Sequence, residues 1–280
     1  MAAFAHASWN LVAKRAAGAG PMFVCAYNLV SCILYGPWVL YQLGRGGAVC
    51  NRTVVAVLIV SGIIHLAYSL FLQRGYQVAD LSVVYPVARG TAPMLSTIAA
   101  LAILGESASP GRLLGLLLVI IGIGVIATRG DLSAFERPGA PAGIRWGGMT
   151  GALIASYSVV DAYAVKAVGV APVVLDWFSN LLRFAALLPF AARRPKQAFE
   201  SVRGYWPHAV AVGFLSPLGY ILILAALASG APLSRVAPIR ETSMVIATLL
   251  GMLFLHERTS RWGLAGCGIV IGGVALLSSA

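Results

Sequence analysis

The chain has 280 residues, of which 59% are hydrophobic and only 10% are charged, and its mean hydropathy is +0.87. Soluble proteins carry about 25% charged residues, and a soluble domain of this length could not bury so much apolar surface in one core. The composition therefore excludes a soluble globular protein and predicts an α-helical membrane protein. The formal charge of +11 comes mostly from short basic connections between apolar segments, which are topology signals, so we expect no nucleic acid among the partners.

Apolar segments long enough to cross a bilayer follow one another along the chain. A transmembrane helix needs about 20 mostly apolar residues, and about ten segments meet this need. The predicted spans are 1–14, 21–43, 54–73, 81–104, 111–128, 147–166, 171–191, 206–228, 233–255 and 262–279. The first is a shortened span, and we expect a few residues to be missing before it.

The longest polar connection, residues 129–146, divides the chain into residues 1–128 and 147–280, and these two halves repeat. Ser82–Val87 (SVVYPV) matches Ser234–Ile239 (SRVAPI). In nearly the same register, Lys14, Asn28, Leu66, Tyr68, Arg89, Thr91, Glu106, Gly115 and Gly122 match Lys166, Asn180, Leu218, Tyr220, Arg240, Thr242, Glu257, Gly266 and Gly273. Five spans in each half make the second copy start on the opposite side of the membrane. The sequence thus predicts two inverted five-helix repeats, an arrangement that supports alternating access.

Three sequence features resemble the EamA branch of the drug/metabolite transporter superfamily. They are His6–Asn10 (HASWN), Leu104–Glu106 (LGE) with its second copy Leu255–Glu257 (LHE), and the glycine-rich span after each copy. The resemblance covers nearly the whole chain and implies a ten-span exporter or exchanger of amino acids and other small metabolites in the bacterial inner membrane. His256 departs from the glycine of the first copy, and the first span is shortened. The HASWN start and the chain length also resemble a branch found near phosphonate catabolism operons, which would imply phosphonate uptake.

Ionisable groups at membrane depth are the first candidates for function, because they cost free energy there. Arg89 follows Pro86 in the fourth span, and Arg240 follows Pro238 in the ninth. An inverted repeat places such matched residues around one pseudo-two-fold axis, where two guanidinium groups could bind a carboxylate or a phosphonate. The alternative is that each arginine snorkels or pairs with a neighbouring helix.

Two acidic residues are candidates for coupling transport to protons. Glu241 could carry the coupling proton or act as a structural partner of Arg89. It should not face the same point as its neighbour Arg240, because adjacent residues lie about 100° apart around a continuous helix. Asp161 in the sixth span could carry a proton or pair with Lys166.

Further polar and aromatic side chains could line a substrate site. Asp176, Asn180 and Arg183 fall on one face of the seventh span, which must face a cavity or another helix. The remaining substrate-binding candidates are Asn28, Thr91, Thr242, Tyr85, Tyr68, Tyr220, Trp9 and Trp177. Packing or interfacial roles are the alternative for the aromatic ones. His65 could lie in the cavity or be a packing histidine.

Closely spaced glycines in the fifth and tenth spans predict helices that approach closely. They are Gly111, Gly115, Gly122, Gly124, Gly268 and Gly272. We expect them at the seam between the halves or in a homodimer contact. Glu106 and Glu257 end their spans close to Arg112 and Arg258, and we expect salt links at the membrane surface there.

The favoured function is export or exchange of a small anionic or zwitterionic metabolite. Efflux of lipophilic cations is the rival within transport, but two buried arginines would repel a cation. The sequence lacks the HExxH, GxGD, GxSxG and Walker A patterns, so we predict no catalytic residue, metal or cofactor. A non-transporting membrane scaffold would not need polar residues at matched depths in both halves. The expected partners are a small-molecule substrate and membrane lipids.

Overall fold

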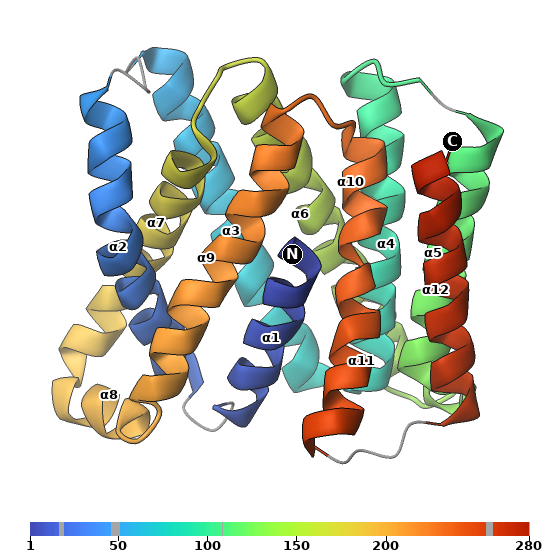
Figure 1. Cartoon of the computed structure of the whole chain (residues 1–280). Helices are drawn as coiled ribbons and strands as arrows, with labels where there is room; N and C mark the ends of the chain where they lie inside the picture. The colour runs from blue at the N-terminus through green and yellow to red at the C-terminus, as the bar shows by residue number, and fades with distance from the viewer. Residues whose placement is uncertain (17–19, 46–50, 108, 256–259, 280) are drawn as a thin grey trace. The chain divides into compact units, whose positions relative to one another are not determined.

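The computed structural model describes residues 1–16, 20–45, 51–107, 109–255 and 260–279, and all regular secondary structure in these residues is helical (Figure 1). The helices are α1 (Ala2–Arg15), α2 (Gly20–Gly44), α3 (Arg52–Val78), α4 (Leu81–Ile103), α5 (Pro110–Thr128), the 3-10 turn η2 (Ser133–Phe135), α6 (Ala140–Lys166), α7 (Pro172–Arg193), α8 (Pro195–Val202), α9 (Trp206–Ala228), α10 (Leu233–Arg240), α11 (Thr242–Leu255) and α12 (Arg261–Ser279). The predicted all-α membrane fold is confirmed.

Six of the described helices, α2, α3, α5, α7, α9 and α12, are long and apolar enough to span a membrane. The first predicted span, α1, has only 14 residues. Helices α4 and α6 are long enough but more polar, and they carry Arg89 and Asp161. Polar residues thus lower the hydropathy of the spans that hold the candidate site residues.

Two helix boundaries differ from the sequence prediction. Helix α6 already begins at Ala140, inside the predicted connection 129–146, and Pro141 suits its first turn because the first N–H groups of a helix need no helical partner. The ninth predicted span, 233–255, is broken, because α10 ends at Arg240 and α11 begins at Thr242. The short helix α8 occupies the connection between α7 and α9.

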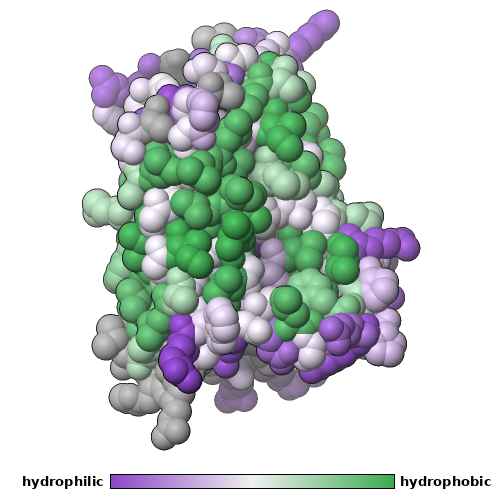
Figure 2. Space-filling model, turned by 90° about the vertical axis from the view of Figure 1, so that its right-hand side faces the viewer, coloured by the Kyte–Doolittle hydropathy of each residue, from purple (hydrophilic) through white to green (hydrophobic). Residues whose placement is uncertain are grey.

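The surface around α5 and α12 is apolar. Large exposed side chains on it include Leu113, Leu117 and Ile121 of α5 and Leu264 and Ile271 of α12. Figure 2 shows apolar residues over the middle of this face, with hydrophilic side chains gathered towards its ends. Such a face has lipid as its natural solvent, which agrees with a multi-pass integral membrane protein.

The helices group into two compact units, and each unit draws on both halves of the chain. The first unit comprises Met1–Leu66 and Asp161–Ser229, and the second comprises Ala67–Val160 and Gly230–Ala280. Within the first unit α2 packs against α7, and within the second α4 packs against α10 and α5 against α12. Each of these pairs joins a helix to its counterpart in the repeat. Contact between counterparts is expected close to a pseudo-two-fold axis.

Glycines form the contact between α5 and α12 in the second unit. A Cβ atom on Gly115 would lie 2.8 Å from the carbonyl oxygen of Gly273, and one on Gly122 would lie 3.0 Å from that of Gly266. In the repeat, Gly115 matches Gly266 and Gly122 matches Gly273. Gly115 thus faces the counterpart of Gly122, and Gly122 faces the counterpart of Gly115. A two-fold contact has this reciprocal pattern, so the predicted seam between the halves is present.

Three other glycines that were predicted for the seam lie elsewhere. A Cβ atom on Gly124, Gly268 or Gly272 would meet no atom within 4 Å. The spacing along the sequence was right for a close helix contact, but it selected the wrong face of the helix in these cases. The homodimer contact stays a prediction.

We expect Gly273→Ala to destabilise the protein by about 1–3 kcal/mol, because the new methyl group overpacks the α5–α12 contact. In α12 the added Cβ atom would lie 2.7 Å from the carbonyl oxygen of Gly115. The matched control is Gly272→Ala, whose methyl group meets open space. Thermal unfolding in detergent should show a lower Tm for the first variant alone, and equal Tm values would contradict the assigned seam.

Candidate functional site

Two arginines and one glutamate meet in the second unit. Nη1 of Arg89 on α4 lies 3.5 Å from Oε2 of Glu241, and Nε of Arg240 lies 3.3 Å from Oε1 of the same carboxylate. The side-chain exposure is 13% for Arg89, 6% for Arg240 and 0% for Glu241. The two arginines that match in the repeat therefore converge on one buried carboxylate.

The contact between Arg240 and Glu241 corrects the expectation that neighbours in sequence cannot face the same point. That expectation assumed a continuous helix, whereas α10 ends at Arg240. The N–H group of Glu241 donates to the carbonyl of Pro238, and the N–H group of Met244 donates to that of Glu241. These short turns replace α-helical bonds where Pro238 already removes a donor. The contact between Nε of Arg240 and Oε1 of Glu241 is thus made at the junction of α10 and α11.

Tyr85 completes this group on α4. The guanidinium carbon of Arg89 lies 5.5 Å from the centre of the Tyr85 ring, within the range of a cation–π contact. Tyr85 also packs on Val119, Ile123 and Met244. The ring thus fixes the arginine on an apolar support.

The predicted threonines, Thr91 and Thr242, lie close to the arginines in the sequence. Thr242 donates from Oγ1 to the carbonyl oxygen of Ile239, 2.8 Å away, and so closes the turn between α10 and α11. Thr91 lies against α6, since a Cβ atom on Gly151 would be 2.7 Å from its Cβ atom. Both threonines therefore have a structural contact, and their substrate role stays a prediction.

Glu106 binds the start of α10 in the second unit. Its Oε1 accepts from the N–H group of Leu233 at 2.6 Å, and its Oε2 accepts from that of Ser234 at 2.9 Å. A carboxylate is well placed there, because the first N–H groups of a helix lack helical partners and carry partial positive charge. The sequence suggested a salt link for Glu106 and missed this cap. Its repeat counterpart Glu257, with His256, lies outside the described residues.

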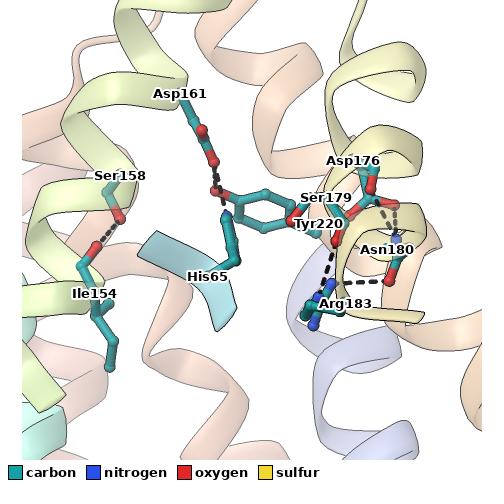
Figure 3. Close-up of polar contacts among 9 residues, drawn as sticks. All are labelled: His65, Ile154, Ser158, Asp161, Asp176, Ser179, Asn180, Arg183 and Tyr220. Atoms are coloured by element: carbon teal, nitrogen blue, oxygen red, sulfur yellow. Dashed lines mark hydrogen bonds and ion pairs between the residues drawn. The ribbon is translucent and has the colours of Figure 1, made fainter. Parts of the chain in front are cut away.

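A second polar group lies in the first unit, where three helices contribute one side chain each. Oδ2 of Asp161 on α6 lies 3.0 Å from Nε2 of His65 on α3 and accepts a hydrogen bond from the Tyr220 hydroxyl on α9. Figure 3 shows His65 and Tyr220 pointing to this one carboxylate. The structure therefore gives Asp161 these partners, where the sequence suggested Lys166, and it gives His65 an acidic partner that the sequence did not reveal.

Helix α7 carries the predicted polar stripe. Nδ2 of Asn180 donates to Oδ2 of Asp176 at 2.8 Å, and Nη2 of Arg183 donates to Oδ1 of Asn180 at 2.8 Å (Figure 3). Asp176 and Asn180 are buried. The stripe is thus a chain of hydrogen bonds that links the aspartate to the arginine along one helix face.

The other predicted residues of the first unit make packing contacts. The indole N–H group of Trp177 donates to the carbonyl oxygen of Cys32 on α2 at 2.9 Å, and that of Trp9 donates to Nδ1 of His6 at 3.2 Å. Asn28 donates to the carbonyl oxygen of Val24 at 2.8 Å. In the second unit, the ring of Tyr68 meets that of Tyr157 edge to face. The substrate-binding role of these residues stays a prediction.

The described residues contain no group of three or more His, Cys, Asp or Glu side chains that could hold a metal ion. Cys25, Cys32 and Cys267 are free thiols. Cys50 lies outside the described part of the chain. What the two polar groups offer is therefore charge and hydrogen bonding from side chains.

Comparison with known proteins agrees with the fold. The model of the EamA-like transporter family matches residues 1–128 and 142–279. A solved structure, described only as a crystal structure of a protein, has a TM-score of 0.78 at 17% sequence identity and covers 99% of this chain and 95% of its own. That likeness shows the fold alone. No curated protein matches the chain.

We expect Glu106→Ala to lower the free energy of unfolding by about 1–2 kcal/mol, because it removes the cap of α10. Glu106→Gln should lose less, since it keeps one acceptor oxygen. Thermal unfolding in detergent measures both, with Glu136→Ala as a control at an exposed glutamate. A Glu106→Ala variant as stable as this control would show that the cap does not stabilise the protein.

We expect Glu241→Gln to cost about 3–5 kcal/mol of stability, because it leaves two buried arginines without their shared carboxylate. Arg240→Gln should cost less, since it leaves Arg89 and Glu241 as a neutral pair. The same unfolding measurement compares the two variants. The reverse order would mean that Glu241 is not the group that offsets the two positive charges.

Proposed function

We propose that this chain, which belongs to the EamA-like transporter family and is thus a membrane transporter, moves a small anionic or zwitterionic metabolite such as an amino acid. The mechanism we propose is alternating access between the inverted repeats. As a site of action we propose a bacterial plasma membrane, with export or exchange as the direction of transport.

One observation carries the proposal: Arg89 and Arg240 share the single buried carboxylate of Glu241. Two guanidinium groups gathered at one place inside a membrane protein favour an anion over a cation as a ligand. A substrate carboxylate would bind to these guanidinium groups.

Guanidinium groups suit this role because their planar N–H donors bind a carboxylate in a bidentate manner. The two arginines occupy matched positions in the two halves, so each conformation of an inverted repeat would keep one arginine in an equivalent place. Tyr85, which supports Arg89, would hold that guanidinium in a fixed orientation. The aliphatic parts of the substrate would contact the apolar residues around it.

Two other functions are less well supported. Efflux of a lipophilic cation would place a positive charge next to two arginines, which would repel it. A phosphonate would bind guanidinium groups as a carboxylate does, so it stays within the anionic class, and transport assays have to separate the two. A scaffold without transport would have no use for two arginines at matched positions of the repeat that meet at one carboxylate.

We expect Arg89→Ala and Arg240→Ala each to abolish counterflow of the substrate in proteoliposomes, because each variant removes one positive charge of the group. Amino acids, organic acids and phosphonates are screened first with the wild-type protein. Arg89→Lys should keep part of the activity, since it retains the charge but loses the bidentate geometry.

Arg45→Ala is the matched control. Arg45 also lies 5.5 Å from a tyrosine ring, that of Tyr41, but it is exposed at the end of α2. Its removal should leave transport unchanged. If transport survives in both Arg89→Ala and Arg240→Ala, the arginines are structural and the proposed anion site is wrong.

A further inference from the structure

The group of His65, Asp161 and Tyr220 in the first unit is not part of the proposed anion site. Asp161 is 0% exposed and His65 is 6% exposed. Oδ2 of Asp161 is shared by Nε2 of His65 and the hydroxyl group of Tyr220. Three helices thus bring a carboxylate, an imidazole and a phenol together in the interior of the unit.

The geometry points to this group as the proton site that couples transport to a proton gradient. The inference rests on the proposed function only in that the chain transports a substrate; it does not depend on the substrate being an anion. The coupling step is one proton added to the group from one side of the membrane and released to the other. No other bond changes.

The group can hold one proton more or less without losing its internal hydrogen bonds. With a neutral histidine, Nε2–H and the tyrosine hydroxyl both donate to Asp161, and the group carries one negative charge. With one more proton, on Nδ1 of His65 or on the carboxyl group, it is neutral overall. Both protonation states keep the two hydrogen bonds to Oδ2 of Asp161.

A second observation concerns the other oxygen of the carboxylate. Oδ1 of Asp161 is buried and has no hydrogen-bond partner among the described residues. A bare oxygen of a charged carboxylate is costly away from water, and a proton removes that cost. Oδ1 of Asp161 is thus the atom of the group that is best placed to accept a proton.

Charged and titratable groups lie on the neighbouring helices. The charge of Asp176 on α7 interacts with that of Asp161, and Arg183 on the same helix interacts with Asp176. On α1, which packs against α9, His6 is held by the indole N–H group of Trp9. The pH dependence of transport must therefore be compared between the wild-type protein and variants of His65, Asp161 and Tyr220.

Asp161 is better suited to coupling than Glu241. Two arginines offset the charge of Glu241, and an arginine does not lose its proton in proteins. The partner of Asp161 is a histidine, the side chain whose charge changes near physiological pH.

The first test needs no substrate. Infrared difference spectra of the purified full chain, recorded between about pH 5 and about pH 8, should contain the carbonyl band of a buried carboxylic acid, and this band should shift in D2O. Asp176 is a second buried carboxyl group, so its contribution is identified with Asp176→Asn. Asp161→Asn should remove the component of the band that remains in Asp176→Asn, and His65→Gln should move the midpoint of that component. Ser158→Ala is the control on α6, because its hydroxyl group bonds only one turn back, to Ile154 (Figure 3).

The second test separates coupling from translocation in proteoliposomes. Asp161→Asn should reduce accumulation driven by a pH gradient to the level without a gradient, while counterflow of the same substrate continues. Tyr220→Phe should shift the pH dependence of uptake. Tyr35→Phe, which removes a buried hydroxyl bonded to the carbonyl oxygen of Phe214, should not.

The outcomes distinguish the two proposals. Loss of the infrared band together with loss of gradient-driven accumulation in Asp161→Asn supports the proton site. A band that is the same in Asp161→Asn as in the wild type, or gradient-driven accumulation equal to that of the wild type, overturns it. Failure of the wild-type protein to move any anionic or zwitterionic compound would contradict the proposed substrate class, and the infrared test would still decide the proton site.

Discussion

Ionised side chains in a membrane span need partners inside the protein, because lipid offers them none, and this requirement fixes which helices of the chain lie together. In the second unit Glu241 receives Arg89 from α4 and its own neighbour Arg240, so α4 and α10 share a polar contact as well as an apolar one. In the first unit Asp161 receives one side chain from α3 and one from α9. Apolar surface alone would not specify these partners.

The repeat is symmetric in its packing and asymmetric in its charge. The glycines of α5 and α12 face one another reciprocally, as a two-fold contact requires. Arg89 and Arg240 also match, but the residue that matches Glu241 is Gly90. The break between α10 and α11 has no equivalent in α4, although α4 carries Pro86 at the matched position. The second half thus supplies both the carboxylate and the irregular backbone that lets it reach two arginines.

The sequence was sufficient for the helices and for the repeat, because apolar length and matched residues are local signals. It also selected Arg89, Arg240, Glu241 and Asp161 as buried polar candidates. It missed the break at Glu241, although Pro238 and the polar residues Arg240–Ser243 stand there. Nor could it give the cap by Glu106 or the pairing of His65 with Asp161, because those contacts join residues far apart in the chain and no periodicity records them.

The two buried carboxylates differ in what holds their charge. Glu241 faces two guanidinium groups, which do not lose their protons, and we propose this group as the anion site. Asp161 faces a histidine and a phenol, and we propose this group as the proton site. An anion site and a proton site in separate units need not compete for the same charge. Each ligand would then shift the conformational equilibrium through its own contacts.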